Sequence, residues 1–178
     1  MNTRLLTAAA LAACAAACAT PAAYAPPPPP PPGQAGPAFD ASQFEWSRRP
    51  GTAAIRGTIS YRGPNAPYVC QDSPVVLTPD TPYSRQRIVR LYGAADRAAV
   101  PLSAVRSRQG RAPSDAFQKF VRTTRCNIDN RFGFDGLPPG SWFVVVAARP
   151  QSGEGEPIVF LRRVQTGKSP QPRQVVMQ

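Results

Sequence analysis

Four cysteines are the residues of this 178-residue chain best suited to chemistry, and they occur as two separate pairs. Cys14 and Cys18 lie near the N-terminus, whereas Cys70 and Cys126 lie in a part of the sequence that has the pattern of a folded domain. The chain has no histidine, which excludes Ser-His-Asp and Cys-His relays and histidine-ligated metal sites. The sequence contains no phosphate-binding loop and no nucleophile elbow. We therefore expect a protein that is not an enzyme and that uses no metal or cofactor.

The N-terminal residues have the pattern of an export signal. Arg4 places a positive charge ahead of a short apolar run, which is far below the ~20 residues that a permanent membrane-spanning helix needs. The run ends in a Leu-Ala-Ala-Cys sequence, which resembles the lipobox of bacterial lipoproteins. The resemblance implies that residues 1–13 are a signal peptide and that Cys14 carries two or three acyl chains. Position 15 is alanine and not the aspartate that commonly retains such proteins in the inner membrane, so the outer membrane is favoured, on its periplasmic or surface face.

Two alternatives stay open for this segment. Cys18 follows three alanines, which lack the aliphatic residue of the lipobox and make the weaker acylation site. An ordinary secretory signal could instead be cut after Ala25, but Pro26 would follow that cut directly, and signal peptidases tolerate proline there poorly. Cys14 is therefore the predicted lipidation site.

Residues 14–50 are predicted to form a disordered, proline-rich tether behind the acylated N-terminus. Seven consecutive prolines at residues 26–32 lack backbone donors and favour polyproline II, at about 3.1 Å per residue or roughly 22 Å in all. Such a spacer would lift a domain off a membrane, and the alternative is a ligand for a proline-recognition module. Phe39, Phe44 and Trp46 are unusual in a linker, so we expect them to dock on the following domain or, alternatively, to contact a partner.

Residues 51–178 have the pattern of one all-β domain. Apolar and polar residues alternate in short runs separated by Gly and Pro, which predicts a single antiparallel β-sandwich of about seven strands. One short helix is predicted at residues 82–92, between Thr81 as N-cap and Gly93 at its C-terminal end, and a polar loop is predicted at residues 94–116. The predicted strands are residues 55–61, 75–78, 117–125, 131–134, 142–148, 158–165 and 174–177, of which 142–148 is apolar on both faces and therefore central.

The segment at residues 126–148 carries the most telling resemblance for the fold. Phe132 and Phe134 alternate in one strand, a Leu-Pro-Pro-Gly connection follows, and an aromatic strand begins at Trp142. This arrangement resembles the hairpin of carboxypeptidase-regulatory-like and related prealbumin-like sandwich domains, with Asn130 in the left-handed position of the preceding turn. The resemblance implies a prealbumin-like, non-catalytic module for most of residues 51–178.

Cys70 and Cys126 are the only cysteines of the predicted domain. Two cysteines in an exported chain predict one disulfide, because the compartment is oxidising. Two separate buried thiols are the alternative, and a metal site built on two cysteines without histidine would be a poor one.

Arginine dominates the charge of the chain. The formal net charge is +11, and all of its 21 basic residues except Lys119 and Lys168 are arginines. The predicted loop would bring together four of them for an anionic partner such as an acidic polysaccharide, lipopolysaccharide phosphates or an acidic protein face: Arg97, Arg106, Arg108 and Arg111. The alternative is an arginine-rich surface that only contacts solvent, and the arginines elsewhere in the chain support it.

These patterns predict a non-catalytic, lipid-anchored protein of the cell envelope whose β-sandwich binds a partner protein or an anionic envelope polymer. A structural subunit of an export or surface assembly is the alternative, and a hydrolase of unrecognised type is a remote one. An envelope location gives no reason to expect nucleic acid as a partner.

Overall fold

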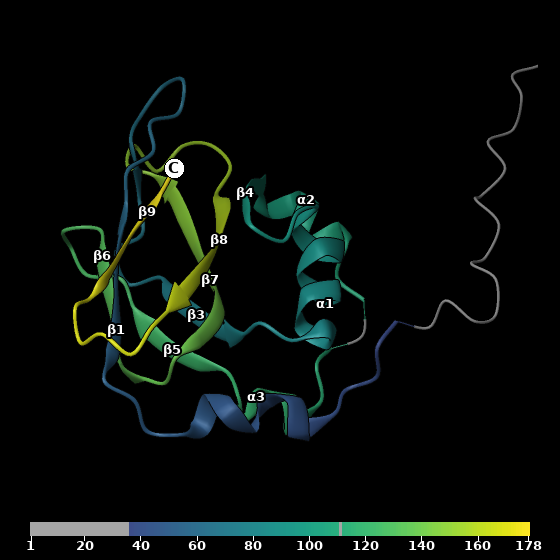
Figure 1. Ribbon diagram of the computed structural model, residues 1–178. Coiled ribbons are helices and arrows are strands. Elements are labelled where there is room, and N and C mark those ends of the chain that lie inside the picture. Colours follow the sequence, from purple (N-terminus) through teal and green to yellow (C-terminus); the bar gives the residue numbers. More distant parts are fainter. Residues whose placement is uncertain (1–35, 111) are drawn as a thin grey trace, which may run out of the picture. The chain divides into compact units, whose positions relative to one another are not determined.

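Two β-sheets packed face to face, with helices beside the larger one, make up the structure (Figure 1). The computed structural model describes residues 36–110 and 112–178, which belong to one compact unit, Ala35–Gln178. The predicted signal peptide, Cys14, Cys18 and the proline run fall on residues 1–35 and lie outside the described residues. Arg111 also lies outside them.

The smaller sheet has three strands in the order β6–β1–β9. They are β6 (Arg131–Leu137), β1 (Ala53–Ile59) and β9 (Arg173–Met177). Strand β1 is antiparallel to β6 but parallel to β9, so the prediction of a purely antiparallel sandwich is wrong for this sheet. An alternating sequence pattern predicts a strand, but it carries no information on the direction of the neighbouring strand.

The larger sheet follows the order β4–β8–β7–β3–β5, and the short strand β2 also pairs with β7. Its strands are β2 (Tyr68–Val69), β3 (Pro74–Pro79), β4 (Arg97–Pro101), β5 (Arg122–Arg125), β7 (Gly140–Pro150) and β8 (Ile158–Thr166). Strand β7 lies between β8 and β3, which confirms the prediction of a central strand. The described residues form nine strands and not about seven, because β2 and β4 lack the alternating pattern on which the prediction depends.

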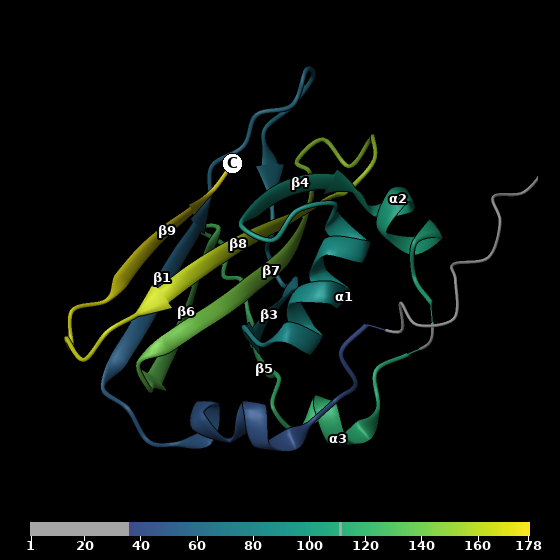
Figure 2. The same ribbon diagram turned by 45° about the vertical axis from the view of Figure 1, so that its right-hand side comes forward.

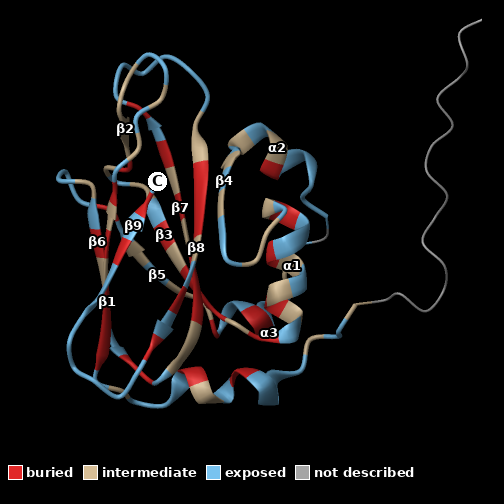
Figure 3. Ribbon diagram, turned by 45° about the horizontal axis from the view of Figure 1, so that its top comes forward, coloured by how far each residue is buried: buried red, intermediate tan, exposed pale blue. Residues whose placement is uncertain are grey.

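The main hydrophobic core lies between the two sheets. Alternate residues of β7 serve its two sides: Trp142, Val144 and Val146 belong to this core, whereas Phe143 and Val145 face the helices. The smaller sheet supplies Ile55, Ile59, Phe132, Phe134, Val175 and Met177. Figure 3 shows buried residues on the strands of both sheets and on helix α1.

Helix α1 (Pro82–Tyr92) has the predicted bounds and lies beside the larger sheet (Figure 2). Thr81 and Ser84 form a reciprocal capping box, with the Ser84 N–H donating to Thr81 Oγ1 and the Thr81 N–H donating to Ser84 Oγ. Gly93 ends the helix with φ +78°, a left-handed conformation that glycine adopts without strain. Ile88 packs against Phe143 and Leu161, so the helix covers a second apolar layer.

The prediction of a loop over residues 94–116 is wrong. The segment contains strand β4, helix α2 (Leu102–Ser107) and the beginning of helix α3 (Asp115–Gln118), so the predicted strand at 117–125 is shortened to β5. Strand β4 is held by backbone pairing with β8, which needs no apolar side chains of its own. The N-terminus of α2 receives its cap from outside the segment, since the carboxylate of Glu156 accepts a 2.9 Å hydrogen bond from the Ser103 N–H.

The aromatic segment before residue 51 is part of the folded unit, which confirms the interpretation that it docks on the domain. It contains the 3₁₀ helix η1 (Ala41–Arg48), whose residue Phe44 is fully buried among Phe117 and Phe120. The ring of Trp46 meets that of Trp142 edge-on, at 4.9 Å between centroids. The folded unit therefore extends upstream of residue 51.

A disulfide joins Cys70 and Cys126, as predicted from the sequence. Both residues are buried, and their Cα atoms are 5.7 Å apart. The side chain of Asn130 accepts a 2.9 Å hydrogen bond from the Cys70 N–H, and Asn130 has φ +59°. The expected left-handed asparagine is thus confirmed, and it connects the β5–β6 turn to the disulfide.

Candidate functional site

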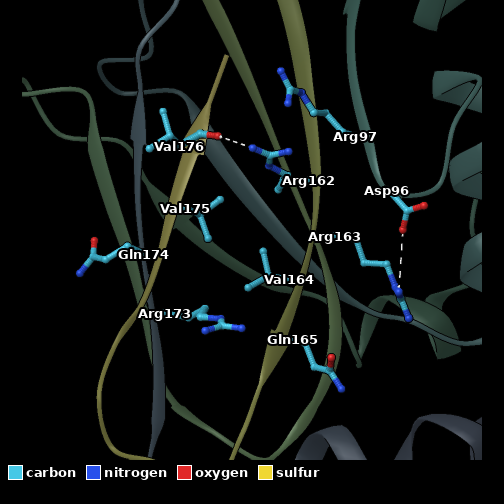
Figure 4. A pocket seen from close by; sticks show the side chains of 10 residues that line it. All are labelled: Asp96, Arg97, Arg162, Arg163, Val164, Gln165, Arg173, Gln174, Val175 and Val176. Atoms are coloured by element: carbon cyan, nitrogen blue, oxygen red, sulfur yellow. Dashed lines mark hydrogen bonds and ion pairs between the residues drawn. The ribbon is translucent and has the colours of Figure 1, made fainter.

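A groove lies where the edges of the two sheets meet, between β8 and β9 (Figure 4). Strand β9 is an outer strand of the smaller sheet, and the pairing of β4 with β8 ends at Arg162, with one further backbone hydrogen bond from the Arg163 N–H to Asp96, so the end of β8 beyond Arg163 is uncovered on that side. The groove has a volume of about 470 Å³, and the core residues Val164 and Val175 form its floor. Four arginines line it, and we call it the arginine groove: Arg97, Arg162, Arg163 and Arg173.

Strand pairing places two of these arginines directly opposite each other. Arg97 of β4 is the partner of Arg162 of β8 in the antiparallel register, so both side chains project from the same face of the sheet. Like charges in directly opposed positions destabilise a sheet. An anion bound between the two guanidinium groups would remove this repulsion.

Arg162 also spans the gap between the sheets. Its Nη2 donates a hydrogen bond of 3.3 Å to the carbonyl oxygen of Val176, on the open side of β9 (Figure 4). Arg173 lies on the same strand as Val176 and extends toward β8 in Figure 4. The two sheets therefore each contribute guanidinium groups to one hollow.

Arg163 differs from the other three arginines because its guanidinium is paired with carboxylates of the protein. Its Nε lies 2.6 Å from Oδ2 of Asp80, and its Nη1 lies 3.8 Å from Oδ1 of Asp96. Within the described residues, no carboxylate oxygen lies within 4.0 Å of the guanidinium of Arg97, Arg162 or Arg173. These three arginines are the cations that the groove can offer to a ligand.

A second hollow of about 360 Å³ continues the groove along the same strands. Gln165 and Arg173 line both hollows, and the loop at residues 167–172 borders the second one. The two hollows together give an elongated path with arginine and glutamine side chains along it. Such a path fits an extended chain better than a small molecule, because small-molecule sites are concave and mostly apolar.

The structure separates the four arginines that the sequence grouped. Arg97 lines the groove, but Arg106 is exposed on α2, and Arg111 lies outside the described residues. Arg108 donates from Nη1 to the carbonyl oxygen of Leu91 at 3.2 Å and thereby joins the C-terminal ends of α2 and α1. The sequence did not indicate Arg162, Arg163 or Arg173 as site residues; the signal for the first two was an adjacent arginine pair directly after four apolar residues, Ile158–Leu161.

The groove has the chemistry of binding and not of proton transfer. Guanidinium groups stay charged at any physiological pH and recognise carboxylate or phosphate groups with paired hydrogen bonds. Among the residues that the structure describes, no cluster of three or more His, Cys, Asp or Glu side chains could hold a metal ion. No helix in this part of the chain is long and apolar enough to cross a membrane.

Comparison with known proteins shows a shared fold. No family model and no curated protein matches the sequence. A crystal structure from Pseudomonas aeruginosa, described as that of a "putative carbohydrate binding protein", is similar at a TM-score of 0.57 with 17% sequence identity. The match covers 79% of this chain and 99% of that one. The chain therefore shares a fold with that protein.

Proposed function

We propose that this chain is a non-catalytic binding protein of the cell envelope, and that the arginine groove binds an anionic envelope polymer. The observation that carries the proposal is the cross-strand pair Arg97–Arg162, two like charges directly opposed at the rim of a groove. A polymer with regularly spaced carboxylate or phosphate groups would neutralise this pair and then reach Arg173 farther along the groove.

Two further points support the proposal, the first for a polymer of sugars and the second for a binding role. The fold is shared with the Pseudomonas aeruginosa protein described as a "putative carbohydrate binding protein", although the low sequence identity transfers no binding residue. The sequence at residues 126–148 also resembles the prealbumin-like, carboxypeptidase-regulatory-like modules, and we propose that the sandwich is of this type. Modules of this class are mostly non-catalytic, which agrees with a binding role.

We also propose that Cys14 anchors the protein to the outer membrane through acyl chains. The support is the Leu-Ala-Ala-Cys sequence, with a positive charge and an apolar run before it and alanine after it. The proline run would then hold the groove away from the lipid surface. Changing Cys14 to Ser should abolish incorporation of labelled palmitate. Labelling that persists in this variant would contradict the assignment to Cys14 and would indicate Cys18 as the acylated residue.

The binding proposal is tested with polygalacturonate, a linear uronic acid polymer, and with dextran as the neutral polymer. The purified protein should bind polygalacturonate at low salt and bind it more weakly as salt rises, because exposed charges are screened over about 8–10 Å at ordinary ionic strength. Dextran should show no binding. If the protein binds neither polygalacturonate nor lipopolysaccharide at low salt, the proposal fails, and capture of a stoichiometric protein complex from solubilised envelope would favour the structural-subunit alternative.

A further inference from the structure

A separate cavity lies on the other side of the larger sheet, away from the core between the sheets. It has a volume of about 220 Å³, is partly open to solvent, and is bordered by the outer face of β3 and β7, helix α1 and the segment around α3. Val76 and Val145 come from neighbouring positions of β3 and β7, while Leu91 and Val105 come from α1 and α2. The helices and the sheet do not fill the space between them.

The lining of this cavity is mainly apolar. Leu91, Val105 and Phe117 are buried and line its wall, together with Tyr92. Burial raises the pKa of Tyr92 above its ordinary value, although the nearby Arg87 acts in the opposite direction. The apolar wall is suited to contact with hydrocarbon.

A cationic hollow adjoins the apolar cavity. It has a volume of about 280 Å³ and is lined by Tyr83, Gln86, Arg87, Arg90 and Ala112. Arg87 lines both spaces, so the apolar cavity and the polar hollow meet at this residue. An apolar cavity with arginines at its entrance is complementary to a molecule that has a hydrocarbon tail and an anionic head.

We propose that this cavity binds a medium-chain fatty acid, with the alkyl chain inside and the carboxylate at Arg87 and Arg90. The volume sets the chain length: a cavity of about 150 Å³ accommodates benzene, so 220 Å³ accommodates roughly eight carbon atoms. The carboxylate would accept hydrogen bonds from guanidinium groups, which bind carboxylates in paired geometry. This site is separate from the arginine groove, and no residue lines both.

The direct test is titration of the full-length protein with octanoate, followed by NMR of its methyl groups. Octanoate should shift the methyl signals of Val76, Leu91, Val105 and Val145, whereas octan-1-ol, which has the same chain without the charge, should bind at least tenfold more weakly. The proposal is overturned if octanoate leaves these four signals unchanged, or if octan-1-ol binds as tightly as octanoate.

Variants separate the chain site from the head site. Val76→Phe and Val121→Phe each replace a small aliphatic side chain of the cavity wall with an aromatic ring and should weaken octanoate binding at least tenfold. Arg87→Gln should weaken octanoate binding similarly and leave octan-1-ol binding unchanged, whereas Arg106→Gln, on the exposed side of α2, should change neither. A folded Phe variant that binds octanoate like the parent overturns the proposal. If both Phe variants fail to fold, the methyl shifts of the parent protein decide.

Discussion

The carboxylate of Asp80 lies 2.6 Å from Nε of Arg163, and this ion pair ties the end of β3 to β8. The same oxygen, Oδ2, lies 2.5 Å from Nη2 of Arg85 on α1. The Asp80 side chain is only 2% exposed, while the two arginine side chains are 41% and 37% exposed. Arg163 thus has a structural role within the groove, which leaves ligand contact to Arg97, Arg162 and Arg173.

Replacing Asp80 with Asn should test this role. The substitution removes a buried negative charge from between two arginines, but both arginines can reach water, so the loss stays below that of a fully buried pair. We expect the free energy of unfolding to fall by about 1–3 kcal/mol, measured by urea denaturation. Asp135→Asn is the matched control, because its pair with Arg56 is exposed, and it should cost less than about 1 kcal/mol. Equal losses in the two variants would contradict the assignment.

The disulfide should be a major contributor to stability. It closes a separation of 56 residues, for which the loss of chain entropy in the unfolded state gives about 4 kcal/mol. The double variant Cys70→Ala, Cys126→Ala should therefore show a much lower denaturation midpoint than the parent. A midpoint unchanged by the double substitution, or by reductant, would show that the bridge contributes little.

Gly140 is required by the docking of η1. A Cβ atom at this position would overlap the ring of Trp46, which packs on Trp142. Gly140→Ala should displace Trp46 and shift tryptophan fluorescence toward that of a more hydrated ring. Gly167→Ala is the control, since a Cβ there meets only the backbone N of Ser169, at an ordinary contact distance of 4.0 Å. Identical fluorescence in the two variants would mean that η1 does not depend on this contact.

Glu156 should make the stability depend on pH. Hydrogen bonds from the side chain and the backbone N–H of Ser103 hold the pKa of the Glu156 carboxyl below its ordinary value near 4.5. A carboxyl whose pKa is lower in the folded state stabilises the protein above its unfolded-state pKa, and this contribution is lost as pH falls through the folded-state value. The melting temperature of the parent should therefore be higher than that of Glu156→Gln at pH 7, and the two melting temperatures should converge as the pH is lowered to 3. A difference in melting temperature that grows as the pH falls would contradict a stabilising role of the ionised Glu156 carboxyl.

The sequence predicted those parts of the fold that depend on local chemistry. The bounds of α1 follow from Thr81 and Gly93, which supply the caps, and the central position of β7 follows from its two apolar faces. Strand β4 was missed because its backbone is held by β8, and its burial pattern alternates only between exposed and intermediate residues. The parallel pairing of β9 with β1 was not predicted either, because the direction of a strand relative to its neighbour depends on the course of the chain and not on local sequence.

The site was predicted less well than the fold. Arg97 was assigned to an anion-binding set, but its partners in space are Arg162 and Arg173, which lie far from it along the chain. Only the pairing of β4 with β8 and the approach of β9 bring the three together. A cluster of basic residues within one segment therefore indicated the charge of the site but not its members.

The anion-binding groove is tested most directly by two triple variants that remove the same charge. One carries Arg97→Gln, Arg162→Gln and Arg173→Gln in the groove, and the other carries Arg49→Gln, Arg62→Gln and Arg106→Gln at exposed positions outside it. Affinity for polygalacturonate is measured for both at low salt. The groove variant should bind at least tenfold more weakly than the parent, while the surface variant stays within about threefold. Equal weakening would show attraction by net charge alone, and unchanged binding by the groove variant would contradict the account.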